Sequence, residues 1–152
     1  MKFELLSVSN LELYVKYLEQ ALIEEPEMML VEKVDLESLK NRLCDPFYQS
    51  KKSILAIKDN EVIGRIEYHF YGCLQDGFRM AYVDWVYVLP QFRQEGIGQS
   101  LFDEFEKDCR KNKVDQYYLI RATNPNANSF YQNFKNANLD NAPILRKDLS
   151  EK

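Results

Sequence analysis

Apolar residues near the N-terminus share helical spacing, namely Leu11, Tyr14, Val15, Leu18 and Leu22. This spacing predicts a helix. Ser9 and Glu12 form a capping-box pattern at its start, and Pro26 ends the helix or lies just past its end. A short strand is predicted before it, over Lys2–Leu6. A second helix is predicted over Asp35–Leu43, with Asp35 as its cap and the end placed before a proline.

The middle of the chain changes to a strand pattern. Ser53–Lys58 and Glu61–Tyr71 read as a hairpin joined by a tight turn at Asp59-Asn60, and Gly72–Gly77 as a loop. Arg79–Leu89 is the strongest predicted strand, because its β-branched and aromatic residues make it apolar on both faces.

Helices and strands continue to alternate toward the C-terminus. The predicted elements are a helix over Gly96–Asn112, a strand over Gln116–Thr123, a short helix over Asn126–Phe134 and a final strand over Ile144–Leu149. This order, with hairpins at the front, indicates a mixed α/β sheet.

Composition narrows the class of protein. A chain of 152 residues with 45% hydrophobic and 29% charged residues is expected to form one domain. A net charge of −4 argues against nucleic-acid partners, which need a basic face. The longest apolar run, Trp85–Leu89, is too short for a membrane span, and the start has no apolar stretch typical of a secretory signal. We therefore expect a cytoplasmic protein without membrane contacts.

Cysteine and histidine are scarce. Cys44, Cys73 and Cys109 show no zinc-ligand spacing, and a nucleophilic triad would have to use His69, the only histidine. We expect reduced thiols and no metal site. An acyl-cysteine route through Cys73 and His69 lacks an evident third partner.

The strand Arg79–Leu89 runs into a glycine-bearing turn, Pro90–Gly98, that opens a helix. Backbone N–H groups and the helix dipole make such a turn a site for anions, and Arg93 adds a fixed charge. The turn lacks the Gly-Lys-Ser/Thr ending of a Walker loop, and Leu101 stands where a dinucleotide fingerprint needs glycine. A helix cap with incidental glycines is the alternative.

The string V-x-P-x-F-R-x-x-G-I-G over Val88–Gly98 resembles motif A of the GNAT N-acetyltransferases. Asn124–Tyr131, reading N-P-N-A-N-S-F-Y, resembles the family's motif B, and Leu145–Leu149 resembles its last strand. One departure is Lys135-Asn136, where family members usually have Gly-Phe; Asn can take the left-handed helix-end conformation that Gly takes more easily.

The resemblance implies a single α/β GNAT domain over residues 1–152. Its sheet would be mixed and mostly antiparallel, with two splayed parallel central strands, Arg79–Leu89 and Gln116–Thr123, and helices on both faces. It also implies acetyl-CoA as co-substrate, no metal, and an amine acceptor. The implied coenzyme-binding residues are Tyr87, Val88, Arg93, Gln94, Glu95, Gly96, Ile97, Gly98, Gln99, Asn124, Asn128 and Tyr131.

The resemblance also implies catalytic roles. Tyr131 would protonate the departing thiolate, since a phenol is protonated at neutral pH, and a backbone N–H near Val88 would polarise the carbonyl. A core aromatic is the alternative for Tyr131. Turn and cap chemistry is the alternative for the Asn-Pro-Asn segment at residues 124–126, and it is compatible with coenzyme binding.

Asp84 is the candidate base, because it is the only charged residue within Met80–Leu89 and many family members carry Glu at this place. A structural carboxylate is the alternative. Glu67 is the second candidate, although its alternation with Arg65 and His69 is more typical of a solvated face, and His69 is expected to be structural.

The function predicted from these features is acetyl transfer by direct attack of a primary amine of a small molecule or peptide. Residues 11–37 hold eight acidic side chains against two lysines, which suits a cationic acceptor or simply a solvated helix face. The alternatives are a non-catalytic acyl-CoA-binding module and an unrelated α/β interaction domain. A monomer or a homodimer is expected.

Overall fold

One five-stranded sheet organises the first of two structural units, Met1–Leu119; the second begins at Ile120. This computed structural model describes residues 1–150. The strands are β1 (Lys2–Leu5), β2 (Lys51–Lys58), β3 (Glu61–Gly72), β4 (Arg79–Val88) and β5 (Gln116–Tyr118). The α-helices are α1 (Leu11–Glu24), α2 (Leu36–Cys44), α3 (Ile97–Lys111) and, in the second unit, α4 (Pro125–Gln132). Short 3-10 turns lie at Val8–Asn10, Pro26–Met28, Pro46–Tyr48 and Pro90–Phe92.

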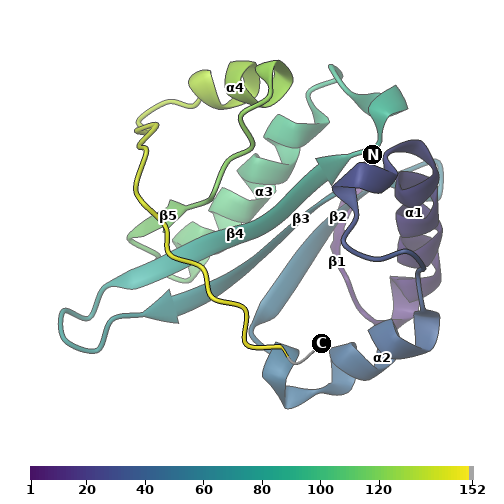
Figure 1. Cartoon of the computed structure of the whole chain (residues 1–152), viewed down its shortest axis with the longest axis horizontal. Helices are drawn as coiled ribbons and strands as arrows, with labels where there is room; N and C mark the ends of the chain where they lie inside the picture. The colour runs from purple at the N-terminus through teal and green to yellow at the C-terminus, as the bar shows by residue number, and fades with distance from the viewer. Residues whose placement is uncertain (151–152) are drawn as a thin grey trace. The chain divides into compact units, whose positions relative to one another are not determined.

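The strands lie in the order β1-β2-β3-β4-β5, with antiparallel neighbours up to β4 and a parallel β4–β5 pair (Figure 1). The mixed, mostly antiparallel α/β sheet predicted from the sequence is therefore confirmed. The parallel ladder runs only from Met80↔Gln116 to Tyr82↔Tyr118, so β4 continues to Val88 beyond the end of β5.

Two predicted strands differ from the structure. The strand predicted over Gln116–Thr123 is formed only as far as Tyr118, and the strand predicted over Ile144–Leu149 is wrong, since residues 133–150 contain no strand. Leu145 and Leu149 are 90% and 81% exposed. An alternating sequence favours extended backbone, but a strand also needs a partner to complete its hydrogen bonds, and these segments have none in a described ladder.

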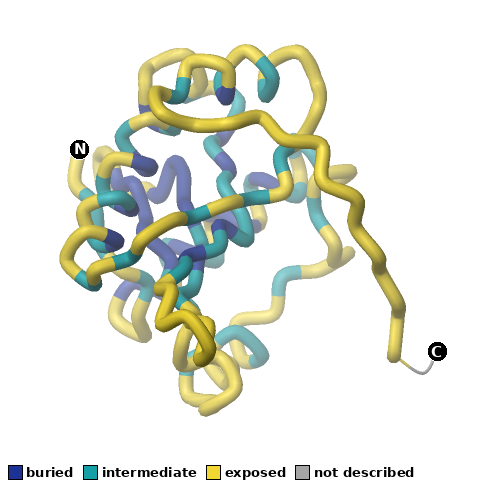
Figure 2. Tube along the Cα trace, turned by 90° about the vertical axis from the view of Figure 1, so that its left-hand side faces the viewer, coloured by how far each residue is buried: buried dark blue, intermediate teal, exposed yellow. Residues whose placement is uncertain are grey.

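Helices α1 and α3 cover opposite faces of the sheet (Figure 1). Gly64 in β3 faces α3, since a Cβ built there would lie 3.4 Å from Leu101. The next residue, Arg65, faces α1, since its guanidinium lies 5.6 Å from the ring centroid of Tyr14. Successive strand residues point to opposite faces, so the two helices are separated by the sheet. The buried positions lie mainly on β2, β3 and β4 and on α1 and α3, and Figure 2 shows them gathered in the interior of this unit.

The ends of α1 and α2 test the predicted caps. The capping box at Ser9 and Glu12 is wrong: α1 starts only at Leu11, and the Ser7 N–H donates to Asn10 Oδ1 at 2.9 Å in the 3-10 turn before it. In α2, Asp35 Oδ1 accepts from the Ser38 N–H at 3.2 Å, as predicted.

Backbone angles confirm the tight turn predicted at Asp59-Asn60. Asp59 and Asn60 have φ values of 52° and 62°, as the tight hairpin turn between β2 and β3 requires. Asn136 has a left-handed φ of 56° but lies beyond the end of α4 at Gln132, so it does not cap that helix.

The C-terminal end of α1 is bound to the end of β4. The Tyr17 hydroxyl donates to the Tyr87 carbonyl at 2.8 Å, and the Tyr87 hydroxyl donates to Glu25 Oε1 at 2.9 Å. Arg93 pairs with the same carboxylate. Burial opposes ionisation of Glu25, but the hydrogen bonds from Arg93 and Tyr87 outweigh it, so the pKa of Glu25 is lowered.

Removing the Phe105 side chain should test the core under α3. Phe105 is fully buried and its ring packs 4.7 Å from Tyr68 and 4.9 Å from Tyr117, between ring centroids. We expect Phe105→Ala to lower the free energy of unfolding in urea by about 3–5 kcal/mol because it leaves a cavity. Phe47→Ala is the matched control: Phe47 is 83% exposed, and a change within about 0.5 kcal/mol is expected. Equal losses in both variants would contradict this description of the core.

The lowered pKa of Glu25 predicts a pH-dependent stability. A carboxylate whose folded pKa is lowered stabilises the fold above its unfolded pKa, about 4.3, and loses that contribution as pH falls through the folded value. Glu25→Gln should therefore cost about 1 kcal/mol at pH 7 and progressively less below about pH 4. Denaturant unfolding across this range measures the difference, with Glu19→Gln, an exposed position on α1, as control. A cost that does not depend on pH would rule out the ionised pair as its cause.

Candidate active site

The turn after β4 presents backbone N–H groups at the start of a long helix. Gln94 and Gly96 have left-handed φ values of 64° and 79°, and residues 93–96 are exposed. The first backbone hydrogen bond of α3 runs from Ser100 N to Gly96 O at 3.0 Å, so the N–H groups of Ile97, Gly98 and Gln99 have no partner within the helix. N–H groups without a partner inside the helix, at a helix start, are suited to binding an anion.

Arg93 is fixed beside this turn. Its Nε donates to the Val88 carbonyl at 2.9 Å, and its guanidinium lies 5.3 Å from the ring centroid of Tyr87 and pairs with Glu25. Glu95 lies 3.6 Å from Lys58. The predicted residues Tyr87, Val88, Arg93, Gln94, Glu95, Gly96, Ile97, Gly98 and Gln99 are thus brought together at one end of the sheet.

The backbone of Val88 points away from β3. The Leu89 N–H donates to Ile63 O at 2.9 Å, and in an antiparallel ladder the neighbouring residue directs its N–H and C=O the other way. The Arg93 bond to the Val88 carbonyl agrees with this orientation. Since β5 pairs only as far as Tyr82, the Val88 N–H lies on the edge of β4 beyond the β5 ladder.

Asp84 occupies a β-bulge. Glu67 pairs with Trp85, but the next residue, Tyr68, pairs with Val83, so Asp84 is the extra residue of β4. Its Oδ1 lies 2.5 Å from Lys51 Nζ, and its Oδ2 lies 2.9 Å from His69 Nδ1. The side chain of Asp84 is 20% exposed. The bulge therefore aims the carboxylate at the face of the sheet that carries His69.

The same face holds further charges and aromatic rings. Arg65 is buried, its Nη1 lies 3.5 Å from Glu67, and its guanidinium lies within 6 Å of the rings of Tyr14 and Trp85. Glu67 accepts a hydrogen bond from Ser53 at 3.2 Å. The prediction that Arg65, Glu67 and His69 share a face is confirmed by these contacts.

Asn124, Asn128 and Tyr131 lie in the second unit, on and around α4. Asn124 Oδ1 caps the helix by accepting from Ala127 N at 2.9 Å, and Asn128 Nδ2 donates to Thr123 O at 2.9 Å. Tyr131 is buried, and burial raises its pKa, so its hydroxyl stays protonated at neutral pH. The cap chemistry expected of Asn124 is confirmed, whereas the coenzyme-binding roles of all three residues stay predictions.

Two functional candidates were not singled out as such by the sequence. Lys51 contacts Asp84 only because the β2–β3 register places it opposite His69, and His69 was expected to be structural. The scarcity of histidine and its alternation with Arg65 and Glu67 were the available signals. The bulge that brings Asp84 to them has no marker in the sequence.

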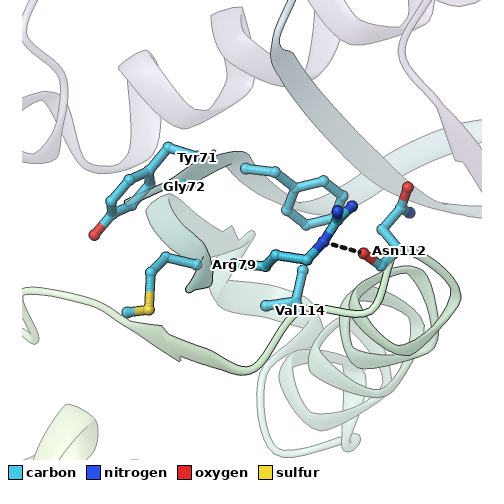
Figure 3. Close-up of a pocket in the computed structure, with 7 residues that line it drawn as sticks. Tyr71, Gly72, Arg79, Asn112 and Val114 are labelled. Atoms are coloured by element: carbon cyan, nitrogen blue, oxygen red, sulfur yellow. Dashed lines mark hydrogen bonds between the residues drawn. The ribbon is translucent and has the colours of Figure 1, made fainter. Parts of the chain in front are cut away.

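A separate cavity of about 270 Å³ lies where β3 and β4 are joined, against the end of α3 (Figure 3). Arg79 Nε donates to the Asn112 carbonyl at 3.0 Å there, and Tyr71, Gly72 and Val114 also line it. It contains none of the predicted site residues.

Among residues 1–150, no three His, Cys, Asp or Glu side chains gather as metal ligands, and no helix is long and apolar enough to cross a membrane.

Several solved structures share this fold. An aminoglycoside acetyltransferase from an uncultured soil metagenomic sample, in complex with trehalose, has a TM-score of 0.81 and 17% identity over 98% of this chain and 96% of its own. Ribosomal-protein-alanine N-acetyltransferase from Brucella melitensis has a TM-score of 0.73 and 17% identity, over 97% and 100% of the two chains. A predicted acetyltransferase with acetyl-CoA from Clostridium acetobutylicum has a TM-score of 0.66 and 16% identity, over 97% and 96%. At these identities the likeness shows the fold alone.

No curated protein sequence matches the chain significantly. The sequence pattern of the Acetyltransferase (GNAT) family, however, matches residues 13–135, which include β2–β4, the turn, α3 and α4. With the fold and the turn geometry in agreement, this match identifies the chain as a member of the GNAT acetyltransferase family.

Proposed function

We propose that this protein transfers an acetyl group from acetyl-CoA to a primary amine of a small molecule or a peptide. The observation that carries the proposal is the turn that joins β4 to α3, with left-handed residues at Gln94 and Gly96 and with N–H groups at the start of α3 that have no partner within the helix. The similar structures named above include acetyltransferases of an aminoglycoside and of a ribosomal protein, which supports an amine as acceptor.

The turn fits the pyrophosphate of the coenzyme. In this proposal, the N–H groups of residues 94–99 bind the phosphate oxygens, and Arg93 adds positive charge while Glu25 holds it in place. Tyr87 and Val88 border the thioester, and Asn124 and Asn128 bind the remainder of the coenzyme. Acetyl-CoA supplies the acetyl group as an activated thioester.

Three groups of the chain would serve the chemistry. The Val88 N–H, which points away from β3, donates to the carbonyl oxygen as its negative charge increases. The Tyr131 hydroxyl donates its proton to the departing thiolate and regains one from the attacking nitrogen, which carries an excess proton once it has bonded to the carbonyl carbon. Asp84 takes up the proton that the amine loses, so the amine attacks as a neutral nucleophile.

The acceptor is proposed to reach the face that carries Asp84, Glu67 and Arg65, on the side of α1. Acidic residues within 11–37 would attract a cationic amine toward it, and six of the eight are exposed. A non-catalytic acyl-CoA-binding module is not favoured, because such a module needs neither the bulge at Asp84 nor its two hydrogen-bond partners.

Two measurements on the wild-type protein test the proposal. Calorimetry should show saturable binding of acetyl-CoA, and free thiol should appear only when acetyl-CoA and a suitable primary amine are both present. Gly96→Ala should weaken coenzyme binding, because a side chain at φ 79° strains the turn. Gly77→Ala, also at positive φ but in the distant β3–β4 loop, is the control for strain alone. No heat at millimolar acetyl-CoA would overturn the proposal.

Tyr131→Phe tests the proton donor. Removing the hydroxyl should lower kcat about 100-fold or more, because general-acid assistance to the thiolate is lost, and should leave the Kd for acetyl-CoA nearly unchanged. Steady-state thiol release and calorimetry measure the two quantities. Tyr48→Phe, outside the proposed site, is the matched control. An unchanged kcat in Tyr131→Phe would remove this residue from the mechanism.

A further inference from the structure

Three side chains meet on the proposed acceptor face, each from a different strand. Lys51 comes from β2, His69 from β3 and Asp84 from β4. Lys51 Nζ lies 3.1 Å from His69 Nδ1 and 2.5 Å from Asp84 Oδ1, and His69 Nδ1 lies 2.9 Å from Asp84 Oδ2. The three groups therefore form a triangle in which each pair lies within hydrogen-bond distance.

One ring nitrogen, Nδ1 of His69, faces both a donor and an acceptor. When Nδ1 has no proton, it can accept from the Lys51 ammonium, and when it is protonated, it can donate to Asp84. A structural histidine needs a partner for only one of these states. This ring keeps a hydrogen bond through Nδ1 in both, which suits a group that gains and loses a proton during function.

The charges around His69 are balanced. Lys51 of β2 carries a positive charge and Asp84 of β4 a negative one, and both contact Nδ1. The rings of Tyr82 from β4 and Tyr71 from β3 lie 5.8 and 6.0 Å from the imidazole, between centroids. Glu67 and Arg65 share the face and pair with each other. The His69 side chain is 27% exposed, so the ring also reaches water.

We propose that His69 is the store for the proton that Asp84 removes from the acceptor amine. The inference rests on the proposed function. The ammonium group of the acceptor gives one proton to Asp84 Oδ2 and keeps the electron pair of the broken N–H bond. The same oxygen passes a proton to the lone pair of His69 Nδ1, so Asp84 is again a carboxylate and His69 is an imidazolium. His69 later releases its proton to water.

Lys51 holds the triangle in the state that is ready to accept. Its ammonium occupies Asp84 Oδ1, which leaves Oδ2 facing the imidazole, and its hydrogen bond to Nδ1 favours the tautomer with the proton on Nε2. Lys51 and His69 act through Asp84 and are positioning residues for the reaction.

Nuclear magnetic resonance tests the triangle without any activity measurement. The chain has one histidine, so ¹⁵N-labelled protein gives a single imidazole signal. At high pH its shifts should show the proton on Nε2. Lys51→Met should move the titration midpoint upward and Asp84→Asn downward, each by about one pH unit or more, because a positive and a negative neighbour are removed in turn.

The neighbouring lysine provides a matched control. Lys52 pairs with Asp108 of α3, so Lys52→Met should leave the midpoint where it is in the wild-type protein. A wild-type signal with the neutral proton on Nδ1, or a midpoint that neither Lys51→Met nor Asp84→Asn moves, would overturn the inference.

Kinetics test the role of the stored proton. In the wild-type protein, the acidic limb of kcat/KM should follow the His69 titration measured by resonance. His69→Gln keeps a hydrogen-bonding side chain but cannot store a proton, so kcat should fall about 100-fold and the limb should move away from the His69 midpoint. If the wild-type protein acetylates amines and the His69→Gln variant shows the same rate and pH profile as the wild-type protein, the inference about His69 is overturned and the proposed function stands. A wild-type protein that binds acetyl-CoA but acetylates no amine would overturn the proposed function, and the proton store with it.

Discussion

The bulge at Asp84 is the constraint on which the rest of the site depends. With one extra residue in β4, the pairings place Ala81, Val83, Val86 and Val88 on the face of α3. Met80, Tyr82, Asp84, Trp85 and Tyr87 fall on the face of α1. Strict alternation would instead group Val86 and Val88 with Asp84. The bulge thus separates small apolar residues, which pack under α3, from the acid and the large rings, which form the proposed acceptor face.

The same strand sets the orientation of the other proposed groups. Because pairing with β5 stops at Tyr82, the edge of β4 beyond it is left to the Val88 N–H and to Arg93, which binds the Val88 carbonyl. The strand then ends in the turn that opens α3. The proposed coenzyme contacts and the proposed proton acceptor are therefore carried at different positions of one strand, and the sheet register fixes the spacing between them.

Local features could be predicted from the sequence, and features that need a partner could not. The Asp59-Asn60 turn, the Asp35 cap and the turn at Gly96 depend on neighbouring residues, and each was found where the pattern placed it. The length of β5, the strand expected over Ile144–Leu149 and the bulge depend on what lies alongside, which no spacing within a segment reveals. His69 shows the limit: its face was predictable, but its contacts with Lys51 and Asp84 required the register of three strands.

The balance of charge on the proposed acceptor face gives a physical reason for a route by which a proton leaves Asp84. Lys51 and Arg65 balance Asp84 and Glu67, so the face has no net charge while His69 is neutral. Burial of the Arg65 guanidinium costs free energy, because its buried Nε and Nη1 make no hydrogen bond within residues 1–150. The ion pair with Glu67 and the cation–π contacts with the rings of Tyr14 and Trp85 offset this cost. In the proposed reaction, each proton taken from an amine would make this face positive and would repel the next ammonium group. A partly exposed imidazole can return that proton to water, which restores the balance before another cationic acceptor arrives.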